Sequence, residues 1–161
     1  MYRCTMLSEV RGARVEDWVD VKVWQEGPAS GRVLLAEDDP TLRLVLTRLL
    51  RGAGYQVVAI SHGAEALDLL EGRRGYDLVV TESRMPHLSG AELVRILRGS
   101  RRSAIPVVVL AGTPPDPGQI KEWERLGGVS WMLKPFDCRA LLVVLAEALG
   151  ESTPEAKSWR R

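Results

Sequence analysis

Apolar residues gather in five short blocks along the chain, and longer amphipathic stretches separate them. The blocks are almost continuously hydrophobic, as expected of strands that are buried on both faces of a parallel sheet. Polar residues, glycine or proline bound each block, which limits the predicted strands to four to six residues. The predicted strands are residues 33–36, 55–60, 77–81, 106–110 and 129–133.

The stretches between the blocks carry apolar residues at helical spacing. In the first of them, Leu42, Leu46 and Leu49 fall on one face of a helix, and charged residues occupy the other face. Pro40 suits the first position of this helix, and the glycines that follow Arg51 end it. A weaker helical pattern lies around Trp123, and leucines mark a final helix near the C-terminus.

Short polar side chains mark where the later helices begin, because they accept hydrogen bonds from free backbone N–H groups. Ser61 is predicted to cap the second helix, and Asp137 the last. Ser89 and Glu92 have the spacing of a capping box for the third helix. In that helix we expect Ile96 to be buried together with the neighbouring leucines.

Five strands that alternate with five helices predict an α/β fold, a doubly wound five-stranded parallel sheet with helices on both faces. This domain is expected to span residues 31–149. Residues 1–30 form an N-terminal extension and linker, and residues 150–161 a polar C-terminal tail. Within the extension, Trp18–Trp24 alternates with a period of two, so it is either a poorly ordered segment or a strand that pairs with a sheet edge or a partner.

The composition is that of an ordinary globular protein. The chain of 161 residues has 22 Lys and Arg against 21 Asp and Glu, so no overall field favours nucleic acid or an anionic membrane. No apolar run is long enough to span a bilayer, and the first residues do not resemble a signal peptide. Cys4 and Cys138 are expected to be free thiols. We expect a cytoplasmic protein.

Charged residues follow the first, third and fifth predicted strands. Glu37, Asp38 and Asp39 follow the first strand, Glu82 the third and Lys134 the fifth. Because the carboxyl ends of parallel strands share one edge of a sheet, these side chains should converge there. Crowded carboxylates repel one another, so a hard cation such as Mg²⁺, or the ammonium of Lys134, is needed to relieve the repulsion.

Four segments of this pattern resemble the receiver domain of bacterial two-component response regulators. They are Leu34–Pro40, Tyr76–Val80, Met85-Pro86 with Gly90, and Lys134–Asp137. The resemblance covers residues 31–149 and implies the five-stranded fold already predicted. It also implies signalling in which a histidine kinase phosphorylates an aspartate at the end of the third strand.

The resemblance assigns roles to the acidic edge. Glu37 and Asp38 stand where the family has its acidic pair, with Asp38 the expected direct ligand of Mg²⁺. Glu82 stands at the phosphoacceptor position and would complete the metal site with these two. Arg84 would offer a backbone carbonyl. Lys134 would contact the phosphoryl group, aimed inward by a cis peptide bond before Pro135.

Several positions depart from the family pattern. Glu82 replaces the acceptor aspartate, and its extra methylene moves the carboxylate outward by about 1.5 Å. Ala111 replaces the threonine or serine whose hydroxyl binds the phosphoryl group in the family. Trp131 stands for the switching tyrosine or phenylalanine, and three prolines in residues 113–117 restrict the loop that normally moves.

These departures favour an atypical, single-domain receiver that is not phosphorylated at the usual position. We expect it to be no enzyme and to act by protein–protein interaction with a histidine kinase or a downstream signalling protein. We expect no nucleic-acid-binding domain and no membrane segment. A homodimer would use the face made by the fourth helix, fifth strand and fifth helix, where Trp123 and Arg139 are expected.

Two alternatives stay open. The first is a genuine phosphoacceptor that uses Glu82 or a neighbouring aspartate, Asp38 or Asp39, with Mg²⁺. The second is a Mg²⁺-dependent hydrolase on a related α/β fold. Two loop histidines, His62 and His87, and a set of arginines are expected to be solvated; the arginines are Arg95, Arg98, Arg101 and Arg102.

Overall fold

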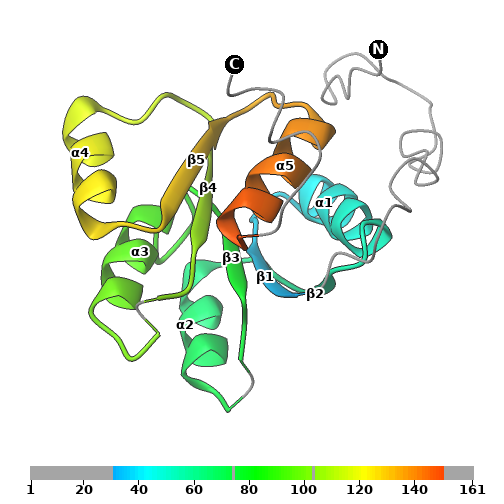
Figure 1. Ribbon diagram of the computed structural model, residues 1–161, viewed down its shortest axis with the longest axis horizontal. Coiled ribbons are helices and arrows are strands. Elements are labelled where there is room, and N and C mark those ends of the chain that lie inside the picture. The colour runs from blue at the N-terminus through cyan, green and yellow to red at the C-terminus, as the bar shows by residue number, and fades with distance from the viewer. Residues whose placement is uncertain (1–30, 74, 103, 151–161) are drawn as a thin grey trace.

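The computed structural model describes residues 31–73, 75–102 and 104–150. A five-stranded parallel sheet with strand order β2-β1-β3-β4-β5 forms the centre of the domain (Figure 1). The α/β fold predicted from the alternating pattern is therefore confirmed. The strands are β1 (Arg32–Ala36), β2 (Gln56–Ile60), β3 (Leu78–Glu82), β4 (Val107–Ala111) and β5 (Val129–Leu133).

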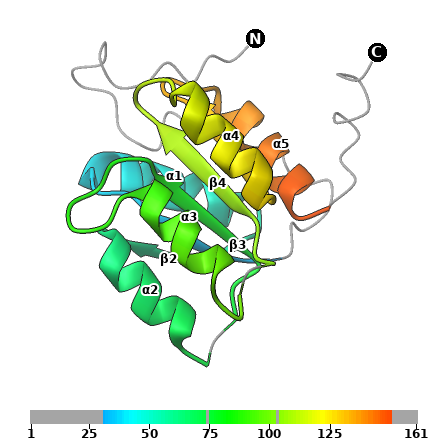
Figure 2. The ribbon, with the colours of Figure 1, turned by 90° about the vertical axis from the view of Figure 1, so that its left-hand side faces the viewer.

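Helices cover both faces of the sheet and create two separate hydrophobic cores (Figures 1 and 2). Helices α1 and α5 cover one face, where their leucines meet the alternate residues Val33, Leu35, Leu78 and Val80. Helices α2, α3 and α4 cover the other face. The helices are α1 (Pro40–Gly52), α2 (Gly63–Glu71), α3 (Gly90–Arg98), α4 (Pro117–Leu126) and α5 (Cys138–Ala148).

Strands β3 and β4 end one residue later than the hydrophobic pattern predicted. The ladder between them continues to Glu82, which pairs with Leu110, so Glu82 is the last residue of β3. The start of β3 shifts likewise to Leu78. Just before it, Asp77 and Arg32 are joined by two hydrogen bonds, since the Asp77 backbone N–H donates to the carbonyl oxygen of Arg32 at 2.8 Å and the Asp77 carboxylate accepts from the Arg32 backbone N–H at 2.7 Å. Ala111 is the last residue of β4 rather than the first residue after it.

Two predictions about helices were wrong. The residue that caps α2 is His62 instead of Ser61, and its side chain makes no capping hydrogen bond. The helix begins at Gly63, where a Cβ would lie 2.5 Å from the carbonyl oxygen of Leu88, so only glycine allows this close approach. In α3, Ile96 is 44% exposed, because the buried stripe runs through Leu93, Val94 and Leu97 and Ile96 lies about 100° around the helix from it.

Trp123 was expected at the face made by α4, β5 and α5, and this prediction was also wrong. Its side chain is only 3% exposed and packs into the core shared by α2, α3 and α4.

The arginines of α3 bind neighbouring parts of the fold. Arg95 forms an ion pair with Glu122, and Arg98 donates to the carbonyl oxygens of residues 105, 127 and 128.

The predicted strand Trp18–Trp24 lies outside the described residues, as do the rest of residues 1–30 and residues 151–161. Within the described part of the chain, no helix has the length and hydropathy needed to cross a membrane.

Candidate functional site

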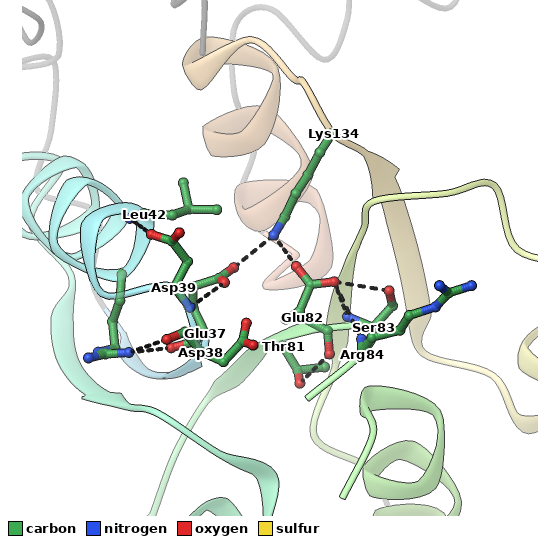
Figure 3. Close-up of polar contacts among 10 residues, drawn as sticks. Glu37, Asp38, Asp39, Leu42, Thr81, Glu82, Ser83, Arg84 and Lys134 are labelled. Atoms are coloured by element: carbon green, nitrogen blue, oxygen red, sulfur yellow. Dashed lines mark hydrogen bonds and ion pairs between the residues drawn. The ribbon is translucent and has the colours of Figure 1, made fainter. Parts of the chain in front are cut away.

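Three strands bring the charged side chains of the site together at one edge of the sheet (Figure 3). Glu37 directly follows β1, Glu82 ends β3, and Lys134 directly follows β5. Both glutamates are buried. Glu37 and Lys134, which are 97 positions apart, therefore meet at this edge, as the parallel topology predicted. We call the group formed by Glu37, Glu82 and Lys134 the pocket.

Lys134 lies between the two glutamates and forms an ion pair with each. Its ammonium donates a hydrogen bond of 3.0 Å to Oε2 of Glu37 and contacts Oε2 of Glu82 (Figure 3). The Lys134 side chain is only 17% exposed. Since little solvent reaches the group, these pairs are screened much less than surface ion pairs.

The second oxygen of each glutamate is also hydrogen-bonded. Oε1 of Glu82 accepts from the Ser83 backbone N–H at 2.9 Å and from the Ser83 hydroxyl at 3.0 Å. The backbone N–H of Arg84 lies 3.4 Å from the same oxygen. Oε1 of Glu37 accepts from the backbone N–H of Asp39 at 3.1 Å. Both buried carboxylates thus have all their oxygens engaged.

Sequence reasoning did not identify Ser83 as a member of the site. The signal that could have found it is its position, because a serine directly after a strand-end carboxylate can offer both its N–H and its hydroxyl to that carboxylate.

The pKa values of the site reflect burial and pairing together. Burial raises the pKa of the Glu37 carboxyl, and the hydrogen bond and charge of Lys134 offset only part of this shift. For Lys134 burial alone would lower the pKa, but the hydrogen bonds to Glu82 and Glu37 outweigh it and raise the pKa above its ordinary value. Lys134 therefore stays a cation at neutral pH.

The two aspartates after Glu37 play different parts. Asp39 caps helix α1, since its carboxylate accepts a hydrogen bond of 2.7 Å from the backbone N–H of Leu42. The Asp38 side chain is exposed. Arg43 fixes the backbone of this turn by donating to the carbonyl oxygens of Glu37 and Asp38 at 2.7 and 3.2 Å.

The carboxylates in this arrangement do not fit a magnesium ion. Among residues 31–73, 75–102 and 104–150, no three His, Cys, Asp or Glu side chains form a group that could hold a metal. The oxygens of Glu37 and Glu82 that face each other both contact Lys134. Asp39 is turned toward the helix it caps.

The sheet order and the charged edge agree with comparisons to known proteins. The family model of the response regulator receiver domain matches residues 33–146. The chain belongs to this family.

Relatives of this receiver domain occur in larger proteins. It is 31% identical over 128 residues to the transcriptional regulatory protein FixJ of Bradyrhizobium diazoefficiens, covering 80% of this chain and 61% of FixJ. It is 33% identical over 125 residues to the 3',5'-cyclic-nucleotide phosphodiesterase regA of Dictyostelium discoideum, covering 76% of this chain but only 15% of regA. The chain thus spans less than two thirds of these relatives.

Solved receiver structures share the fold. The chemotaxis response regulator CheY4 of Vibrio cholerae superposes with a TM-score of 0.66 at 26% identity, covering 74% of this chain and 99% of CheY4. The receiver domain of the sensor histidine kinase PA1611 from Pseudomonas aeruginosa PAO1 gives a TM-score of 0.67 at 27% identity, covering 76% of this chain and all of that one. The PA1611 structure has a magnesium ion in its active site cleft.

Of the two predicted switch positions, Ala111 lies next to the pocket, whereas Trp131 lies on the surface of β5. Ala111 is buried, and its carbonyl oxygen accepts a hydrogen bond of 2.8 Å from the backbone N–H of Lys134. The Lys134–Pro135 peptide bond is cis. Trp131 is 38% exposed on β5, and Arg84 donates to the hydroxyl of Thr113 at 3.3 Å in the loop after β4.

The two histidines, His62 and His87, which were expected to be solvated, lie near each other. Their ring centroids are 6.2 Å apart and their planes nearly perpendicular. His87 has a positive φ of 69° and is exposed, whereas Nδ1 of His62 is buried and has no hydrogen-bond partner among the described residues. The pair joins the loop before α2 to the loop before α3.

Proposed function

We propose that this receiver domain acts as a protein-binding module of two-component signalling and is not phosphorylated at Glu82. In this proposal it is a binding module and not an enzyme. The observation that carries the proposal is the state of the Glu82 carboxylate, which is buried and has both oxygens hydrogen-bonded or ion-paired.

A carboxylate must present a free oxygen in line with the departing group before it can accept a phosphoryl group. Oε2 of Glu82 contacts the ammonium of Lys134, and Oε1 is held by Ser83. The extra methylene also places this carboxylate about 1.5 Å further out than an aspartate would lie. Glu82 therefore occupies the space that an incoming phosphoryl group would need.

The surroundings of Glu82 lack a means of responding to a phosphoryl group. Ala111 has no hydroxyl with which to bind a phosphoryl oxygen. The charge of Glu82 is a weak substitute for phosphorylation, since a phosphoryl group carries about −1.5 to −2 charges and three acceptor oxygens. We propose that the pocket holds one fixed arrangement.

In this proposal, the partner binds to the surface of the domain and not in the pocket. We propose a histidine kinase or a downstream signalling protein as the partner, and the face formed by α4, β5 and α5 as the region of contact or of homodimer formation. On β5, Trp131 and Leu133 are both exposed large apolar side chains. Alternating residues of a strand share one face, so these two side chains form a single apolar patch.

Phosphorylation can be tested by incubating the full chain with acetyl phosphate and Mg²⁺ and measuring its intact mass. We expect no phosphoryl adduct on the natural chain. The matched variant carries Glu82→Asp and Ala111→Thr, which together restore the family pattern, and we expect it to gain one adduct that alkali removes. A stoichiometric adduct on the natural chain that a Glu82→Gln variant lacks would contradict the proposal.

A second candidate is phosphorylation of the neighbouring Asp38, which the exposure of its side chain favours. The same incubation separates the two candidates. An adduct that persists in a Glu82→Gln variant and disappears in an Asp38→Asn variant would identify Asp38 as the acceptor.

A further inference from the structure

We infer that the groove between the C-terminal ends of α2 and α3 is the docking site of the chain's own N-terminal segment, residues 15–26. When bound there, the segment would cover apolar side chains that the described residues leave exposed. The groove lies away from the pocket and from β5. The inference therefore goes beyond the proposed function and does not depend on whether any residue is phosphorylated.

The groove lies where α2 and α3, which run side by side, come to their C-terminal ends (Figure 2). Its volume is about 770 Å³, within the range of about 300–1,000 Å³ that is usual for sites that bury a ligand. Four of the side chains that line it are large and apolar, namely Leu67, Leu70, Ile96 and Leu97. Ile96 is 44% exposed. Exposed apolar surface with a polar rim is typical of an interaction site.

The rim of the groove is basic. Among the described residues that line it, Arg101 and Arg102 stand against one acid, Glu71. The Arg102 guanidinium donates a hydrogen bond of 2.7 Å to the carbonyl oxygen of Gly72, which ties the turn after α3 to the end of α2. A guanidinium has five N–H donors, so this bond leaves others for a carboxylate. The groove therefore suits an occupant with apolar side chains and acids beside them.

The amino-acid sequence of residues 15–26 matches this requirement. The segment contains four valines, two tryptophans, four acids and one lysine. In an extended chain, Val19, Val21 and Val23 would share one face, and Asp20 would lie on the other face between them. Tryptophan is among the side chains that contribute most to binding at interfaces. The segment is therefore apolar like the floor of the groove and opposite in charge to its rim.

The chain enters the domain near the groove. Helices that connect parallel strands run antiparallel to them, so the C-terminal ends of α2 and α3 lie at the edge of the sheet where Arg32 begins β1. The Arg32 guanidinium lies 5.1 Å from the centroid of the Tyr76 ring. Tyr76 is buried in the same core as Leu70 and Leu97 of the groove. Residues 27–31 can span up to about 17 Å, and so short a tether gives the segment a high effective concentration at the groove.

The test is ¹⁹F NMR of the full chain labelled with fluorotryptophan, in which tryptophan-to-phenylalanine variants assign each resonance. Ile96→Asp places a charge in the groove. Leu44→Asp is the matched control, because Leu44 is 45% exposed and lies on α1, which covers the other face of the sheet. We expect Ile96→Asp to lower the docking equilibrium constant at least about tenfold, so that the Trp18 and Trp24 resonances move toward their positions in the urea-unfolded chain. Leu44→Asp should leave both resonances where they are in the natural chain.

A second variant, Arg101→Glu, reverses a charge of the rim at an exposed position and should move both resonances in the same direction as Ile96→Asp. The resonance of the buried Trp123 shows whether each variant is folded. If Ile96→Asp does not fold, Arg101→Glu alone decides the test.

Three results would overturn the inference. The first is that Trp18 and Trp24 of the natural chain already resonate at their unfolded positions. The second is that the folded groove variants move these resonances no more than Leu44→Asp does. The third is that the resonances of the natural chain depend on protein concentration, which would mean that the groove binds a second copy of the chain.

Discussion

The pocket at the carboxyl edge of the sheet and the outer surface of β5 are organised in opposite ways. In the pocket, Glu37, Glu82 and Lys134 are largely buried and contact one another, so their charges are neutralised within the domain. On β5, Trp131 and Leu133 are large apolar side chains exposed to solvent. In the pocket the polar groups have partners within the domain, whereas the apolar side chains of β5 face solvent.

This contrast bears on which region of the domain takes part in signalling. In a receiver that is phosphorylated, chemistry in the pocket alters the surface. Here the pocket already contains its own counter-ion, so the proposal assigns recognition to the surface alone. Variants that break the pocket should therefore affect stability strongly, and variants on β5 should affect it weakly.

The largest effect is expected from Lys134→Met in the presence of a chelator. Removing one partner of a buried ion pair leaves uncompensated charge, which typically costs about 3–5 kcal/mol in the free energy of unfolding. Urea denaturation measures the loss, and Lys121→Met, the control at an exposed position of α4, should change the value by no more than about 0.5 kcal/mol. Equal stabilities of the two variants would mean that the ion pairs of the pocket contribute little.

A smaller loss is expected from Gly90→Ala, which disturbs the pocket from the α3 side. A Cβ at residue 90 would lie 2.4 Å from the carbonyl oxygen of Glu82, so the end of β3 must shift. Overpacking of this kind costs about 1–3 kcal/mol. At the other end of α3, Gly99→Ala meets nothing closer than 3.6 Å and serves as the control. If both variants unfold at the same urea concentration, this close contact does not constrain β3.

A third comparison uses the free energy of unfolding of the natural chain and of Lys134→Met at alkaline pH. Pairing raises the pKa of Lys134 in the folded state above its ordinary value of 10.5. The stability gained from the protonated Lys134 side chain is fully present below pH 10.5. It is lost as the pH rises through the pKa that Lys134 has in the folded state. The difference in unfolding free energy between the natural chain and Lys134→Met should therefore be constant near neutral pH and shrink above pH 10.5. A difference that grew with pH would have the wrong sign.

The smallest effect on stability is expected from Trp131→Ala. Because this side chain is 38% exposed, the loss should stay below about 1.5 kcal/mol, whereas Trp123→Ala in the core should cost about 3–5 kcal/mol. Sedimentation at high protein concentration then measures self-association, which Trp131→Ala should weaken if the natural chain forms a dimer through β5. If Trp131→Ala and Trp123→Ala lowered the free energy of unfolding equally, Trp131 would be as important to the folded state as a core residue, which would contradict its assignment to an open surface.

Sequence periodicity was sufficient to predict the strands and helices, because both faces of the sheet are covered and each strand is a short apolar run. It was less reliable for single positions. The burial of Trp123 and the exposure of Ile96 depend on how each helix is rotated against the sheet, and no short-range pattern fixes that rotation. The start of α2 at Gly63 depends on a contact with Leu88, which is distant in sequence.

For the site, the sequence predicted which charged residues would share one edge, since the topology of a parallel sheet determines it. The pairing within that edge could not be predicted. Asp39 turns away to cap α1, Asp38 stays exposed, and Ser83 contributes two hydrogen bonds to Glu82. These choices follow from backbone directions at the strand ends, which residue types alone do not determine.

The proposed function depends most on one property, which is that the Glu82 pocket does not respond to a phosphoryl group. Beryllium fluoride, a phosphoryl mimic, added with Mg²⁺ to the ¹⁵N-labelled full chain tests this directly. We expect unchanged amide resonances around Glu82, Lys134 and the β5 surface, and large changes in the variant carrying Glu82→Asp and Ala111→Thr. Shifts in the natural chain that spread from the pocket to Trp131 would contradict it.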